Sequence, residues 1–107
     1  DDTLAGGQGD DTYMFTSASN PEADSVNELA GEGTDLLNFS LLTTGVTVNI
    51  NMRNVQTIHL NRTLKLNSFS TFENVTGGTA ADSLTGNSLN NRLTGGGGND
   101  TLNGWHG

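Results

Sequence analysis

Acidic residues recur along this chain at a fixed interval, and each is followed two positions later by an apolar residue. The acidic or amide positions of this pattern lie nine residues apart near both ends of the chain, at Asp2, Asp11, Glu73, Asp82, Asn91 and Asp100. The apolar residues that follow them are Leu4, Tyr13, Val75, Leu84, Leu93 and Leu102. Carboxylates on repeated loops suit a divalent cation, because such an ion is held by several oxygen ligands at once.

Glycine-rich segments precede these acids and indicate how the chain positions them. Gly6–Met14 and Gly95–Asn103 have glycine at the first, second and fourth positions, an acid at the sixth and an apolar residue at the eighth. Ala30–Asn38 follows the same pattern with alanine at the first position. We expect the first six residues to form a turn, since glycine adopts positive φ readily. The last three should form a short strand whose apolar side chain points inward.

These nonapeptides fit G-G-x-G-x-D-x-U-x, where U is a large apolar residue, and they resemble the calcium-binding repeats of the RTX (repeats-in-toxin) family. The resemblance covers roughly residues 1–37 and 73–107. It implies an all-β fold, a parallel β-roll or β-solenoid in which two nonapeptides make one flattened coil. A turn then stacks on the turn eighteen residues away. Stacked turns can supply the six to eight or so oxygen ligands that Ca²⁺ takes.

The resemblance assigns the calcium ions to carboxylates and backbone carbonyls of the loops. The predicted metal-site residues are Asp2, Gly6, Gln8, Gly9, Asp11, Ala30, Glu32, Gly33, Asp35, Gly77, Asp82, Gly95, Gly97, Gly98 and Asp100. The loops that end at Asp11 and Asp35 should stack if the insertion near Asn20 leaves two half-coils between them. The loops that end at Asp82 and Asp100 should hold metal. The loop that ends at Asn91 should hold it poorly or not at all, because a neutral amide is a weaker ligand.

The composition favours a bound metal and argues against several other partners. The chain has 107 residues, of which 32% are hydrophobic and 15 are glycine. That is a thin core for one domain, and bound metal would add stability. The net charge of −8 argues against nucleic acid and against an anionic membrane surface. The chain has no cysteine and no apolar run that approaches the ~18 residues of a membrane helix.

The middle of the chain departs from the pattern. Val46–Ile50, Thr57–Leu60 and Thr63–Leu66 alternate in a way that predicts strands. We expect a single β-solenoid unit over 1–107, in which RTX-type coils at 1–37 and 73–107 flank irregular, wider and metal-free β coils at 38–72. Asp24 is interpreted as the acid of one further repeat. The aromatic residues predicted to fill the core under the wider coils are Phe39, Phe69 and Phe72.

No enzymatic arrangement of residues is found, so we expect no catalysis. The two histidines, His59 and His106, have no neighbouring nucleophile and no metal-ligand spacing. Gly95–Gly98 is not a phosphate-binding loop, since no Gly-Lys-Ser/Thr and no helix follow it. Trp105 is interpreted as a packing or interface residue, and the alternative is that an exposed Trp105 binds a sugar.

The sequence favours a calcium-binding structural module of a secreted bacterial adhesin or filament, of Gram-negative type. The chain begins and ends inside a repeat, and writing Gly107 before Asp1 keeps the nine-residue phase. This predicts that copies stack head-to-tail, with Asp100 of one copy and Asp11 of the next sharing an ion. The alternative is a non-catalytic C-terminal secretion or folding module of an exported enzyme, such as a protease, lipase or epimerase, or of a toxin.

Overall fold

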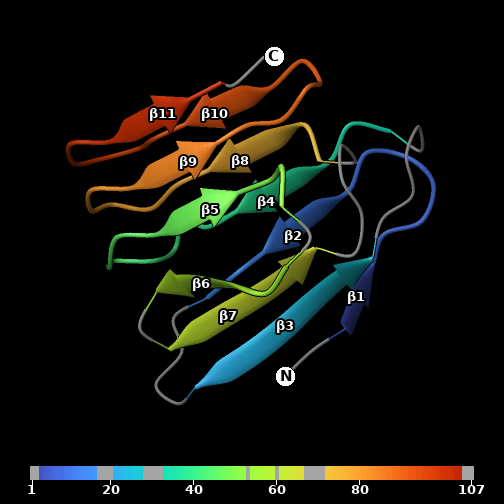
Figure 1. Cartoon of the computed structure of the whole chain (residues 1–107), viewed down its shortest axis with the longest axis horizontal. Coiled ribbons are helices and arrows are strands. Elements are labelled where there is room, and N and C mark those ends of the chain that lie inside the picture. The colour runs from blue at the N-terminus through green and yellow to red at the C-terminus, as the bar shows by residue number, and fades with distance from the viewer. Residues whose placement is uncertain are drawn as a thin grey trace.

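The computed structural model describes residues 3–16, 21–27, 33–52, 54–59, 61–66 and 72–104, and every regular element within these ranges is a β-strand (Figure 1). The strands are β1 (Thr3–Ala5), β2 (Thr12–Met14), β3 (Glu22–Asn27), β4 (Leu36–Asn38), β5 (Thr47–Asn49), β6 (Gln56–His59), β7 (Arg62–Leu66), β8 (Asn74–Thr76), β9 (Ser83–Thr85), β10 (Arg92–Thr94) and β11 (Thr101–Asn103). The expected all-β class is therefore confirmed. No helix long and apolar enough to cross a membrane occurs in the described part of the chain.

The strands form three open sheets, with the orders β1-β3-β7-β6, β10-β8-β4-β2 and β11-β9-β5. In the ladders of the second and third sheets the strands are parallel, and β10 pairs with β8, and β11 with β9, at an offset of eighteen residues. This is the offset that the nonapeptide period predicts. In Figure 1 β1 and β3 lie at one end of the molecule and β10 and β11 at the other, and the chain returns to the first end at β6 and β7.

The first sheet is mixed, so the expectation of purely parallel pairing is wrong at this point. β6 pairs antiparallel with β7, with an irregular register between Thr57 and His59. Only two residues separate the end of β6 at His59 from the start of β7 at Arg62. Such a short connection permits an antiparallel hairpin, whereas a parallel pair needs a crossover of a dozen or more residues. β6 and β7 therefore form a hairpin, while β5 keeps a parallel partner in β9 and β7 keeps one in β3.

The three-residue strands in the middle of the stack bury their central side chain, as the nonapeptide pattern predicts. Leu37, Val75 and Leu84 are fully buried at the centres of β4, β8 and β9. Burying each such side chain stabilises the fold by about 1.5–3 kcal/mol. Leu102, at the equivalent position of β11, is 47% exposed, because β10 and β11 form the last described coil and no described strand lies beyond them. The apolar interior of the coils is therefore uncovered at this end.

Aromatic side chains fill the wider part of the core. Phe39 and Phe72 are fully buried, which confirms two of the three predicted core aromatics, while Phe69 lies outside the described residues. The ring of Phe39 stacks on that of Phe15, with centroids 4.6 Å apart and planes 12° apart. Phe72 meets Tyr13 edge to face, at 5.9 Å. These contacts connect the N-terminal coil with the middle of the chain.

Candidate metal centre

Asp82 and Asp100 lie one above the other, at the ends of the turns that lead into β9 and β11. Asp82 donates its backbone N–H to Oδ1 of Asp100 at 2.9 Å, and Thr101 donates its N–H to the carbonyl of Asp82 at 2.8 Å. Oδ1 of Asp82 accepts the N–H of Val46 in the coil below at 2.8 Å. Each carboxylate thus reaches the backbone of the preceding coil, and the two turns are held in register.

Glycines bring further oxygen atoms close to these two carboxylates. A Cβ at Gly77 would overlap the carboxylate of Asp82 and lie 2.8 Å from the carbonyl oxygen of Gly95. A Cβ at Gly95 would overlap the carboxylate of Asp100. Only residues without side chains leave room for carbonyls and carboxylates to converge here. The turns 77–82 and 95–100 therefore bring carboxylate and carbonyl oxygens together, which are the ligands that Ca²⁺ prefers, and the N–H of Gly78 also donates to Oδ2 of Asp82 at 2.7 Å.

The turn 6–11 and residues 33–35 form a second stack, on the opposite edge of the coils. Asp11 donates its N–H to Oδ1 of Asp35 at 3.0 Å, and Thr34 donates its N–H to Oδ1 of Asp10 at 2.8 Å. β2 and β4 pair in register beside them, so the stacking expected across the insertion near Asn20 is present in the structure. Oδ2 of Asp11 is buried and accepts no hydrogen bond from the described residues. A buried carboxylate oxygen without a hydrogen-bond donor fits a bound cation, because burying a charged oxygen without any partner costs free energy.

Glu73 extends this edge by one coil. Its Oε2 accepts the N–H of Asp35 at 2.9 Å. Burial raises the pKa of the Glu73 carboxyl, the hydrogen bond from Asp35 lowers it, and the charge of Asp35 raises it further. Glu73 has the nine-residue phase, but neither Glu73 nor Asp10 is among the predicted site residues. The phase could have identified Glu73, whereas Asp10 occupies an unspecified position of the pattern.

The remaining predicted site residues divide into three groups. Asp2, Ala30 and Glu32 lie outside the described residues. Gln8, Gly9, Gly97 and Gly98 are exposed, although a Cβ at Gly98 would overlap the backbone of Ala80. Gly6 and Gly33 lie at close contacts, where a Cβ would overlap the carboxylate of Asp11 and the backbone of Gly9, respectively. No group of three or more His, Cys, Asp or Glu side chains is placed to hold a metal within the described ranges, so backbone carbonyls must complete any site.

The turn 86–91 is built differently from the other turns. The side-chain amide of Asn91 donates to the carbonyls of Asn87 at 2.9 Å and Leu89 at 2.7 Å. The side chain of Asn87, which is fully buried, donates to the carbonyl of Phe72 at 2.7 Å. Asn91 therefore satisfies two carbonyls of its own turn, and Asn87 links the turn to Phe72.

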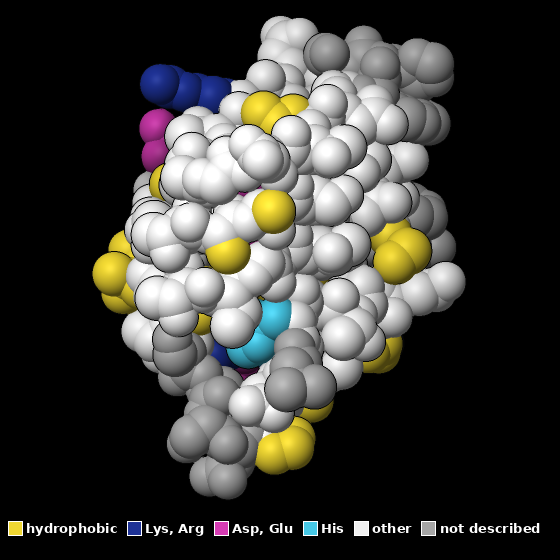
Figure 2. Space-filling model, turned by 90° about the vertical axis from the view of Figure 1, so that its left-hand side faces the viewer, with side chains coloured by type: hydrophobic (Ala, Val, Ile, Leu, Met, Phe, Trp, Pro, Cys, Tyr) yellow, Lys and Arg dark blue, Asp and Glu magenta, His cyan; other side chains and the backbone are white. Residues whose placement is uncertain are grey.

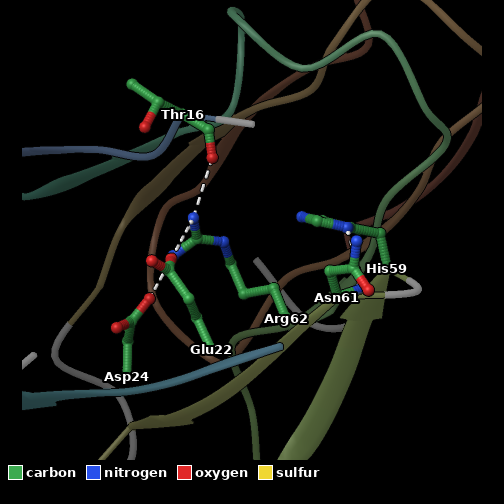
Figure 3. Close-up of polar contacts among 6 residues, drawn as sticks. All are labelled: Thr16, Glu22, Asp24, His59, Asn61 and Arg62. Carbon is green, nitrogen blue, oxygen red and sulfur yellow. Dashed lines mark hydrogen bonds and ion pairs between the residues drawn. The ribbon is translucent and has the colours of Figure 1, made fainter. Parts of the chain in front are cut away.

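Asp24 does not end a turn, contrary to its interpretation as the acid of a repeat. It lies inside β3, buried, and pairs with Nη1 of Arg62 on β7 (Figure 3). Nη2 of Arg62 contacts Oε2 of Glu22 at 3.0 Å and donates to the carbonyl of Thr16 at 2.8 Å. The guanidinium also lies over the ring of Phe15, at 5.2 Å. No spacing in the sequence pointed to this ion-pair cluster.

His59 lies beside the cluster and has no catalytic partner among the described residues. Its Nδ1 accepts the N–H of Asn61 at 3.4 Å, and its Nε2 is buried without a hydrogen bond. Burial lowers the pKa of the imidazole, and the nearby charge of Arg62 lowers it further. Figure 2 shows a histidine side chain, in cyan, at the surface of the face in view. A neutral packing role fits these contacts.

The geometry of the stacked turns agrees with the comparison to known families. Residues 1–15 and 73–107 match the family of the RTX calcium-binding nonapeptide repeat, in four copies. No match to a curated protein was found. The chain thus carries RTX repeats, and such repeats bind Ca²⁺. The turn that ends at Asp35 resembles the repeat but lies outside the matched ranges.

Proposed function

We propose that this chain is a calcium-stabilised structural module in a β-roll arrangement, without catalysis of its own. The observation that carries the proposal is the stacking of acid-ending glycine turns on both edges of the coils. Two stacks are present in the described residues, Asp82 with Asp100 and Asp11 with Asp35. Calcium bound between stacked turns would draw neighbouring coils together, because its ligands come from both turns.

We expect Ca²⁺ to bind with weak affinity, about 10⁻⁴–10⁻³ M per site as in extracellular modules, and to raise the content of β-structure. Calorimetry and far-ultraviolet circular dichroism during a calcium titration measure both. Asp100→Asn should reduce the number of bound ions, because it replaces a carboxylate ligand with an amide. Glu22→Gln removes the same charge outside the turns and should leave calcium binding unchanged. A titration without heat and without spectral change would contradict the proposal.

The setting that we propose for the module is a long secreted adhesin or filament of Gram-negative type, in which copies stack head-to-tail. The exposed Leu102 supports this, since its counterparts in the coils below are fully buried. The direction of the carboxylate-to-backbone bonds also supports stacking, because each acid reaches the preceding coil. Since the turns of Asp11 and Asp100 lie on opposite edges within one chain, Asp11 of one copy reaches Asp100 of another only if the second copy is rotated about the stacking axis so that these edges coincide. Such a contact repeats without closing and gives a fibre.

We expect sedimentation velocity at millimolar calcium to show assemblies that shrink when Leu102 is replaced by Ser, or when Asp11 and Asp100 are both replaced by Ala. Leu41→Ser is the matched control, because Leu41 is 56% exposed and lies away from the ends of the stack. Monomers only, or assemblies indifferent to these changes, would instead favour the alternative function, a secretion or folding module attached to an exported enzyme or toxin.

A further inference from the structure

The turn 86–91 lies within a range that matches the calcium-binding repeat, yet its residues do not fit a calcium ion. At the first glycine of the turns 77–82 and 95–100, the atom that faces the glycine is a carboxylate oxygen, Oδ2 of Asp82 or of Asp100. At the first glycine of this turn, Gly86, it is Nδ2 of Asn91, 2.8 Å from the position of a Cβ. A nitrogen that carries hydrogens points where the other turns place an oxygen.

The assignment of nitrogen and oxygen in this amide follows from its neighbours. Nδ2 of Asn91 lies 2.9 Å from the carbonyl oxygen of Asn87 and 2.7 Å from that of Leu89, and both oxygens need a donor. Turning the amide over would place three oxygens together without a hydrogen between them. Its Oδ1 is left buried without a hydrogen bond from the described residues. The free energy lost at this unpaired oxygen is offset by the two hydrogen bonds that Nδ2 of Asn91 donates.

A second amide fixes the same turn to the coil below. Asn87 is fully buried, donates from Nδ2 to the carbonyl of Phe72 at 2.7 Å, and accepts the N–H of Leu89 on Oδ1 at 3.0 Å. Both sides of its amide are therefore used. Asn91 therefore donates to two carbonyls of its own turn, and Asn87 fixes the turn to the carbonyl of Phe72.

We infer that turn 86–91 is closed by the side-chain amides of Asn87 and Asn91 in place of a calcium ion, so that this edge of the C-terminal coils keeps its shape without metal. The two edges then differ: turns 77–82 and 95–100 respond to calcium, and turn 86–91 does not. The inference rests on the proposed function only in expecting turns 77–82 and 95–100 to respond to calcium.

Asn91→Asp tests this inference, since it exchanges the donor for a carboxylate oxygen that faces two carbonyls. In excess chelator, the folding equilibrium constant from urea unfolding should fall by about 10–100-fold, as expected for losing two hydrogen bonds. Added calcium should restore it, and calorimetry should show more bound ions than in the unchanged protein. Asn90→Asp is the matched control, because Asn90 is the exposed neighbour and gains the same charge.

Equal effects of Asn91→Asp and Asn90→Asp in chelator would overturn the inference. If the unchanged protein does not fold in chelator, the count of bound ions decides, and equal counts for the unchanged protein and Asn91→Asp would overturn it. If the unchanged protein binds no calcium at all, the proposed function is wrong. The stabilities of Asn91→Asp and Asn90→Asp in chelator would still test whether the side-chain amides close turn 86–91.

Discussion

Replacing Arg62 with Ala is expected to lower the free energy of unfolding by about 3–5 kcal/mol, because it leaves a buried carboxylate without its partner. The side chains of Arg62 and Asp24 are only 5% and 2% exposed. The guanidinium also holds Glu22, the carbonyl of Thr16 and the ring of Phe15. Urea unfolding at saturating calcium measures the change.

Two further variants separate the ion pair from general damage to β7. Lys65→Ala removes an exposed cation of the same strand and should change the free energy by less than about 0.5 kcal/mol. Arg62→Met combined with Asp24→Leu removes both charges, and should recover much of the loss, since a buried pair replaced by apolar residues is often neutral. A loss for Arg62→Ala no larger than that for Lys65→Ala would show that the cluster does not stabilise the fold.

The nine-residue period predicted the parts of the fold that repeat. The eighteen-residue offset of β11 on β9, the inward position of Leu84 and the stacking of Asp82 with Asp100 all follow from it. These features are local to each repeat, because a turn of six residues and a strand of three are determined by neighbouring glycines, acids and one apolar side chain. Their copies then stack by the same contacts.

The middle of the chain could not be predicted in the same way. The alternation of apolar residues correctly gave strands near β5, β6 and β7, but alternation does not say whether a pair is parallel or antiparallel. Asp24 and Arg62 are 38 residues apart in the sequence, and nothing near either residue indicates the other. Their pairing depends on how β3 and β7 meet, which is a property of the assembled sheet.

The sequence showed that Asn91 carries no charge, but it could not predict that the side chain of Asn91 acts as a hydrogen-bond donor. The sequence indicated a weaker metal ligand at this position. Only the positions of the carbonyls of Asn87 and Leu89 show that the amide takes up both of them as a donor. The difference matters because a weak ligand predicts a poorly filled site, whereas an occupied donor predicts a turn that needs no ion.

Gly96→Ala is expected to be more destabilising than Gly7→Ala, by about 1–3 kcal/mol at saturating calcium. The two glycines occupy the second position of their turns, and their φ angles are 85° and 83°. The strain of positive φ in alanine is therefore common to both variants. A Cβ at Gly96 would overlap the carbonyl oxygen of Gly78, whereas a Cβ at Gly7 would meet nothing within 4 Å. The difference between the variants thus isolates the contact of turn 95–100 with turn 77–82.

The same pair of variants relates that contact to calcium. Pushing the two turns apart separates Asp100 from Asp82, so Gly96→Ala should weaken calcium binding, measured by calorimetry, while Gly7→Ala keeps the C-terminal stack intact. Equal destabilisation by both variants would mean that the turns do not press on one another in solution. Loss of stability with unchanged calcium binding would place the ions elsewhere than between turns 77–82 and 95–100, because an ion held by both turns cannot be indifferent to their separation.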